Sequence, residues 1–103
     1  MPQAECQTQA QHALLQEFAR LLLGIRSAEQ VIGRKTALGY WISTIVNDAT
    51  DDDRYAVYDR EWKLMDHHPD EEFDFHVTDR KGRHLSELLT IDAGIQGLCR
   101  CFL

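Results

Sequence analysis

Residues 50–79, TDDDRYAVYDREWKLMDHHPDEEFDFHVTD, contain a predicted helix followed by a predicted strand. Large apolar side chains recur in the first part at spacings of three, four and three residues, which is the repeat of one helical face. Acidic residues begin the helix and Pro69 follows it, because Asp caps free backbone N–H groups and proline forbids continuation. We therefore predict that one face of this helix packs on the core, with Trp62 at its centre. That face consists of Tyr55, Tyr58, Trp62 and Met65.

The strand is predicted by strict alternation over residues 73–78, FDFHVT. Apolar residues occupy the odd positions and polar residues the even ones, so they point to opposite faces of a sheet. One face should therefore be core and the other polar. Gly82, in the basic segment that follows, suits a turn that requires a positive φ.

Three further segments complete the predicted elements. Residues 10–25 have the apolar spacing of an amphipathic helix, and residues 27–30 could begin a short one, with Ser27 as N-cap. Residues 36–46, TALGYWISTIV, favour a strand because β-branched and aromatic side chains dominate, although a helical reading stays open. Residues 84–91 fit a short helix or a third strand equally well.

The order of these elements predicts a small α+β domain. It reads helix–strand–helix–strand, followed by a C-terminal hairpin or helix that the pattern leaves undecided. A helix joining two neighbouring strands suits a parallel crossover, and a two-layer sandwich follows, with the helices on the apolar face of the sheet. Residues 1–103 form one domain, in which residues 1–8 are polar and expected to fray.

Composition limits the classes of function. The chain has 103 residues, a net charge of −6 and 44% apolar residues, which is typical of a globular domain and disfavours nucleic-acid binding. It has no run of 18 apolar residues and no secretory signal, so we expect no membrane association and a cytoplasmic location. Three cysteines without a CxxC pair argue against a disulfide framework and a structural zinc site, and suit reduced thiols.

Asp74 and His76 are the candidate catalytic residues. They lie two positions apart on the polar face of the predicted strand, roughly 6.5–7 Å along it, where an acid and an imidazole could relay a proton or bind a metal. Either role needs a third group. His84, Tyr40 and Ser43 are the possible sources, and the sequence does not choose among them.

Two other clusters could bind metal ions. The acidic loop before the helix offers Asp48, Asp51 and Asp52 as oxygen ligands, although helix capping and solvation explain the same residues. His67 and His68 are adjacent, and neighbouring helical residues diverge by about 100°, so we interpret them as favourable charges at a helix end.

No dinucleotide-binding, P-loop, nucleophile-elbow or zincin motif is present, so the sequence favours a non-catalytic protein-interaction or regulatory module without a cofactor. Its partner would be a second copy in a homodimer, or another protein. The alternative is a small enzyme or a ligand- or metal-binding domain that uses Asp74, His76 and the Asp48 loop. Apolar residues on the flank of the helix and at the C-terminus are the predicted interface: Val57, Leu64, Phe102 and Leu103.

Overall fold

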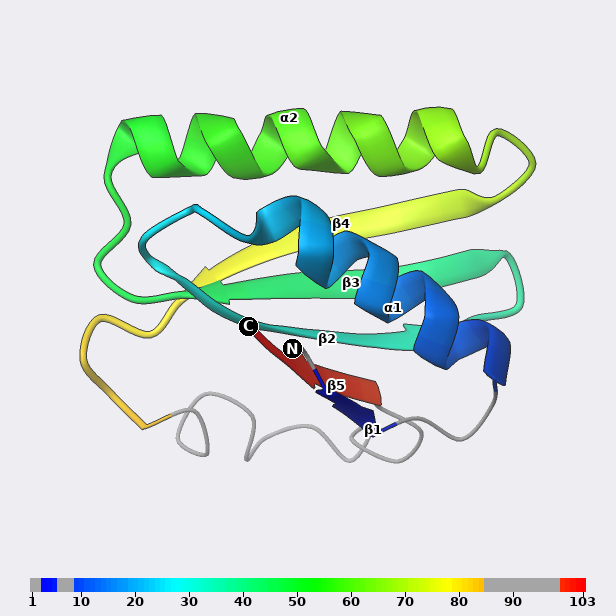
Figure 1. The fold of residues 1–103 in the computed structure, drawn as a ribbon, viewed down its shortest axis with the longest axis horizontal. Helices are drawn as coiled ribbons and strands as arrows, with labels where there is room; N and C mark the ends of the chain where they lie inside the picture. The colour runs from blue at the N-terminus through cyan, green and yellow to red at the C-terminus, as the bar shows by residue number, and fades with distance from the viewer. Residues whose placement is uncertain (1–2, 6–8, 85–98) are drawn as a thin grey trace.

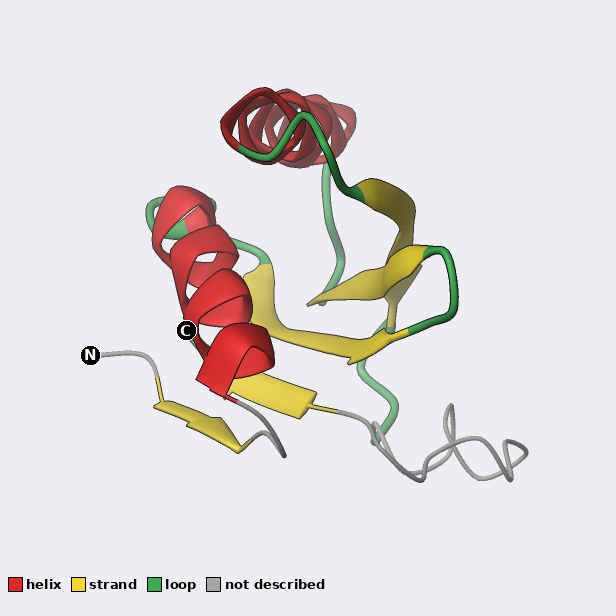
Figure 2. Cartoon of the chain, turned by 90° about the vertical axis from the view of Figure 1, so that its right-hand side faces the viewer, coloured by secondary structure: helices red, strands yellow, loops and turns green. Residues whose placement is uncertain are grey.

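The computed structural model describes residues 3–5, 9–84 and 99–103, which form a five-stranded mixed sheet with two helices packed on one face (Figure 1, Figure 2). The strand order is β1-β5-β2-β3-β4. The predicted two-layer α+β class is confirmed. The elements are β1 (Gln3–Glu5), α1 (Gln9–Leu22), β2 (Ala28–Lys35), β3 (Gly39–Val46), α2 (Asp51–His67), β4 (Glu72–Asp79) and β5 (Cys99–Phe102).

The predicted parallel crossover is formed by β3, α2 and β4. The two strands pair in parallel, with Trp41 opposite Asp74 and Ser43 opposite His76. The strand interpretation of residues 36–46 is thus confirmed, and the helical reading is excluded. Gly39 is required at the start of β3, because a Cβ there would collide with the backbone of β4.

The limits of α2 agree closely with the sequence. Thr50 is the N-cap: its Oγ1 accepts a hydrogen bond from the amide of Asp53 at 3.1 Å, and the Asp53 carboxylate accepts from the amide of Thr50 at 3.2 Å. This reciprocal pair forms a capping box. His68 ends the helix, since its backbone leaves the helical conformation there. Asp48 and Gly82 take positive φ angles of 53° and 77° in the loops that lead into α2 and out of β4.

The main error in the predicted order lies at β2. Residues 27–30 do not begin a helix: β2 starts at Ala28 and forms an antiparallel hairpin with β3. Ser27 precedes that strand instead, and its carbonyl accepts the amide of Asn47 at 3.0 Å, beside the end of β3. The capping signal was therefore local and was overridden by strand pairing.

The chain ends meet at the β1 side of the sheet. β1 pairs with β5, and β5 with β2, so residues 3–5 form the edge strand of the sheet and residues 99–102 the strand beside it. The rest of the segment 1–8 lies outside the described residues. The undecided segment after His84 lies outside the described residues, apart from β5. Cys101 is a free, buried thiol, whereas Cys99 is disulfide-bonded, so the expectation of reduced cysteines is wrong for Cys99.

The core lies between the helices and the inner face of the sheet. The inner face of β4 contributes Phe73, Phe75 and Val77, as the alternation predicted, and Phe75 packs on Phe18 of α1 with ring centroids 5.5 Å apart. Leu103 also packs against this core, whereas Phe102 points away from it and is 46% exposed. Of the two predicted interface residues at the C-terminus, Phe102 is thus the more accessible.

Candidate functional site

The solvent-facing side of α2 carries three large aromatic side chains. Tyr55, Tyr58 and Trp62 are 68%, 42% and 66% exposed, and we call them the aromatic stripe. The rings of Tyr55 and Tyr58 meet edge to face, with centroids 6.4 Å apart. The prediction that this side of the helix packs on the core is therefore wrong.

The core-facing side of α2 is formed by Val57, Glu61 and Leu64. Val57 and Leu64 are fully buried within the single chain, so the prediction that they form an exposed interface is also wrong. Both sides of the helix carry apolar residues at helical spacing, and the carboxylate of Glu61 interrupts the inner set in the sequence. The compact aliphatic side chains line the buried side, while the larger rings remain in solvent.

Glu61 is the functional candidate that the sequence analysis missed. The residue is 9% exposed, and its Oε2 atom is buried without a hydrogen-bond partner in the described structure. Burial raises the pKa of Glu61 to about 7, and the opposing influence of His76 is weaker. Only its position gives a signal in the sequence, four residues after Val57 and three before Leu64.

Acidic side chains share the outer side of α2 with the aromatic stripe. At 100° per residue, four exposed aspartates fall within about 120° of arc together with the three rings. The basic residues of the helix are already paired: Arg54 with Asp79 at 3.2 Å, and both Arg60 and Lys63 with Asp59. The exposed aspartates are Asp51, Asp52, Asp59 and Asp66.

The outer face of the sheet brings Asp74 and His76 together, as predicted. His76 Nε2 lies 3.0 Å from Asp74 Oδ1, and the ring of Trp41 packs on His76 with centroids 5.4 Å apart. The expected third group is not supplied by Ser43, whose hydroxyl is hydrogen-bonded to Thr78 at 3.0 Å. An acid and an imidazole beside an indole can bind a ligand, but they do not complete a catalytic triad.

Tyr40 and His84 do not complete this group. The side chain of Tyr40 packs against the core on the opposite face of the sheet, stacked on Phe73 with ring centroids 5.9 Å apart. His84 is exposed after the turn that follows β4, and among the described residues Asp74 pairs with His76 rather than with His84.

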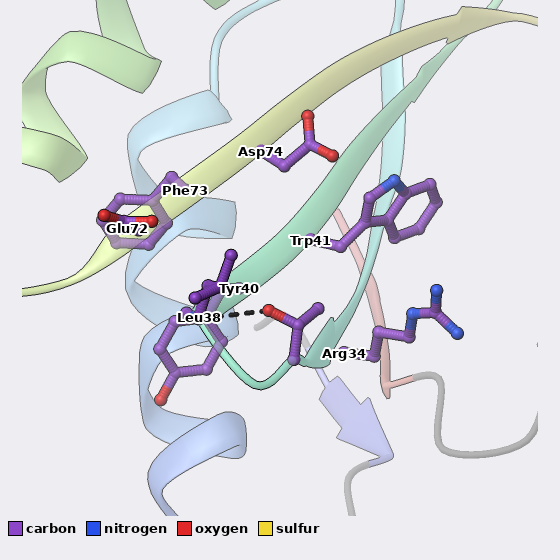
Figure 3. Close-up of a pocket in the computed structure, with 9 residues that line it drawn as sticks. Arg34, Leu38, Tyr40, Trp41, Glu72, Phe73 and Asp74 are labelled. Atoms are coloured by element: carbon purple, nitrogen blue, oxygen red, sulfur yellow. Dashed lines mark hydrogen bonds between the residues drawn. The ribbon is translucent and has the colours of Figure 1, made fainter.

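A shallow cavity of about 250 Å³ lies beside this pair, at the end of the sheet where β2 turns into β3 (Figure 3). Arg34, Trp41 and Asp74 line the cavity from three adjacent strands, and Leu38 lines it from the turn. The volume is close to the lower limit for small-molecule sites. Asp74 was a candidate from the sequence, whereas Arg34 and Trp41 were not, because their proximity depends on the unpredicted pairing of β2 with β3.

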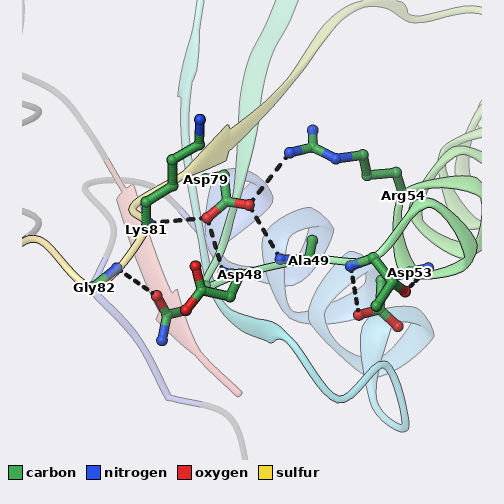
Figure 4. A network of polar contacts seen from close by, with 9 residues as sticks. Asp48, Ala49, Asp53, Arg54, Asp79, Lys81 and Gly82 are labelled. Carbon is green, nitrogen blue, oxygen red and sulfur yellow. Dashed lines mark hydrogen bonds and ion pairs between the residues drawn. The ribbon is translucent and has the colours of Figure 1, made fainter.

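The acidic loop before α2 is organised around Asp79 (Figure 4). The Asp79 carboxylate accepts hydrogen bonds from the amides of Asp48, Ala49 and Lys81 at 2.9–3.1 Å, and it pairs with Arg54. Burial alone would raise the pKa of Asp79, but these donors lower it. Asp51 and Asp52 are exposed in the first helical turn. Over the described ranges, no group of three or more His, Cys, Asp or Glu side chains could hold a metal.

Glu17 of α1 joins both histidines at the end of α2. Its two carboxylate oxygens lie 2.9 Å from His67 Nδ1 and 2.9 Å from His68 Nε2. Adjacent residues can reach one group here because His68 has left the helix, which the sequence interpretation did not anticipate. Burial alone would raise the pKa of Glu17, but the hydrogen bonds from His68 and His67 lower it. This contact links the two helices and borders a second cavity of about 230 Å³, lined by Tyr40 and Glu71 among others.

The function of the chain must be argued from this geometry, because comparison with known proteins gives no match. No family model, curated protein or solved structure matches the chain. In the part of the chain that the structure describes, neither helix is long and apolar enough to span a membrane.

Proposed function

We propose that this protein is a non-catalytic protein-interaction module and that it binds its partner through the outer side of α2. The observation that carries the proposal is the aromatic stripe, formed by Tyr55, Tyr58 and Trp62 on an exposed helix face. With about 200 Å² per aromatic side chain, their exposed fractions amount to roughly 350 Å² of surface. The largest apolar patches on monomeric proteins are about this size and are often functional.

The exposed rings of the aromatic stripe contribute little to the stability of the fold. Trp62 remains 66% exposed, so it contributes only part of the hydrophobic stabilisation of a buried indole. Tyr and Trp are, however, enriched among the residues that dominate binding energy at interfaces. A stripe of this kind on one accessible helix therefore supports a role in binding.

Val57 and Leu64 do not support self-association, because both are buried within the single chain. A symmetric contact through the aromatic stripe would also bring like charges together. In an antiparallel pair centred between Tyr58 and Asp59, the exposed Asp51 of one copy would lie opposite the exposed Asp66 of the other. Such contacts are unfavourable, so the charge pattern favours another protein as the partner.

The outer sheet face supports a second candidate function, binding of a small ligand. His76 contacts both Asp74 and Trp41 there, beside a cavity lined by Asp74, Trp41 and Arg34. A small polar ligand in this cavity could contact Asp74, Arg34 and the indole of Trp41. Titration with a ligand library, followed by NMR of the Trp41 indole N–H, would test this function independently of α2.

A cytoplasmic location remains part of the proposal. The buried free thiol of Cys101 is compatible with a reducing compartment, whereas the disulfide at Cys99 favours an oxidising one. Measuring the free thiols of the protein, purified under alkylating conditions from its native cells, would decide between these locations.

Photo-crosslinking tests the interaction module directly. A photoreactive phenylalanine replaces Trp62 in one variant and Leu38 in a matched control, because Leu38 is 79% exposed but lies on the β2–β3 turn. We expect discrete crosslinked species in living cells from position 62 and none from position 38. Their mass distinguishes a second copy from another protein. Equal crosslinking at both positions, or none at position 62, would refute the proposal.

A further inference from the structure

We propose that the partner segment is a positively charged amphipathic helix that lies along the outer side of α2. This inference rests on the proposed function, since it specifies what the aromatic stripe binds. The stripe is linear rather than concave: Tyr55 and Trp62 are separated by seven residues, or about 10 Å along the helix axis. A second helix matches such a line, because its own side chains repeat at the same spacing.

The charges around the aromatic stripe favour a partner with a positively charged surface. Asp51, Asp52 and Asp66 are exposed beside the rings and have no ion pair with any residue that the structure describes. The bases of α2 cannot neutralise them, because Arg54 already pairs with Asp79, and Lys63 with Asp59. A partner carrying Lys or Arg would find complementary charge here.

The rings favour the same kind of partner. The faces of Tyr and Trp attract guanidinium and ammonium groups, and they also pack well on aliphatic side chains. An amphipathic helix with apolar residues on one side and basic residues at its margins offers both groups at once. A second copy fits less well because its aspartates would face those of the first, and phosphate groups would be repelled by the same aspartates.

Fluorescence anisotropy with designed peptides tests the inference. The probe is a labelled 18-residue Leu/Lys amphipathic helix, and its controls are a scrambled Leu/Lys peptide and a Leu/Glu helix with the same apolar face. The protein variants are the triple change Tyr55→Ser, Tyr58→Ser and Trp62→Ser, and the matched surface control Leu38→Ser. Circular dichroism checks their folding, and Trp62→Ser alone replaces the triple variant if that one unfolds.

We expect the Leu/Lys helix to bind at least tenfold more tightly than either control peptide. The triple variant should lose tenfold or more of this affinity, while Leu38→Ser should leave it unchanged. Replacing Asp51, Asp52 and Asp66 with Asn should also weaken binding, with a smaller dependence on salt. Each of these effects follows from one part of the proposed contact.

Other outcomes overturn the inference in distinguishable ways. Equal binding of the scrambled peptide, or full binding by the triple variant, would show attraction between net charges alone. Tighter binding of the Leu/Glu helix through the rings would refute the positive partner but retain the interaction module. No binding by any peptide, together with no crosslinking at position 62, would refute both proposals.

Discussion

Replacing Glu61 with Gln should change the pH dependence of stability, because burial raises the pKa of this carboxyl to about 7 in the folded protein. The unfolded chain has a Glu pKa of about 4.3. Between these values the folded state holds a proton that the unfolded state has released, so wild-type stability falls as pH rises. A difference of roughly 2.7 pKa units corresponds to about 3.7 kcal/mol at most.

The magnitude can be measured as a difference between two proteins. We expect similar effects of pH on wild type and Glu61→Gln below pH 4. The free energy of unfolding of the variant should then rise relative to that of wild type by up to about 3.7 kcal/mol between pH 4.5 and 8, and the difference should become constant above pH 8. Urea denaturation followed by circular dichroism at six pH values provides the free energies of unfolding. The amide keeps the shape of the side chain, so the pH-dependent part isolates the charge.

Asp66→Asn is the matched control, since it removes an exposed acid from the same helix. Its free energy of unfolding should follow that of wild type across the whole pH range, within about 0.5 kcal/mol. If Glu61→Gln instead ran parallel to wild type from pH 4.5 to 8, Glu61 would be ionised and solvated in the folded protein. The reasoning from its burial would then be refuted.

Three further changes test the structural roles of other residues. Asp79→Ala should cost about 2–4 kcal/mol in urea denaturation, because three backbone amides and Arg54 lose their acceptor; a loss below 1 kcal/mol would contradict this. Glu17→Gln should cost about 0.5–1 kcal/mol at pH 7, since the partly exposed carboxylate binds both histidines. The lowered pKa of Glu17 means that this difference should disappear on acidification below pH 4. Leu64→Ala should cost about 2–5 kcal/mol and Trp62→Ala less than about 1, and the reverse order of melting temperatures would restore the original face assignment.

The elements with strong local signals could be predicted from sequence. α2 begins at a capping box and ends before Pro69, so both limits are encoded within a few residues. β4 alternates strictly because one face is core and the other outward, and its parallel pairing follows from the single helix that connects it to β3. These features depend on neighbours in the sequence and need no knowledge of distant contacts.

β2 and β5 could not be predicted in the same way. β2 is buried over four consecutive residues, Val31 and Ile32 among them, and therefore shows no alternation. Its stability comes from pairing with strands on both sides, β3 and β5, which the sequence does not place beside it. The cavity formed by Arg34, Trp41 and Asp74 depends on this pairing. Asp74 and His76 were predictable because they share one strand.

The reversed orientation of α2 has a physical explanation that also bears on function. Periodicity identifies the faces of a helix but does not show which face is buried when both carry apolar residues, as in α2. The larger side chains of the aromatic face led to the prediction that this face is buried. The fold instead buries Val57, Leu64 and the carboxyl of Glu61, and exposes Tyr58 and Trp62. The opposite orientation of the helix would be expected from stability alone, with the carboxyl exposed and the rings buried. Burying a carboxyl destabilises the fold, whereas burying an indole stabilises it. Departures of this kind are expected where a surface is used for binding, and here both departures occur on the helix that we propose as the docking surface.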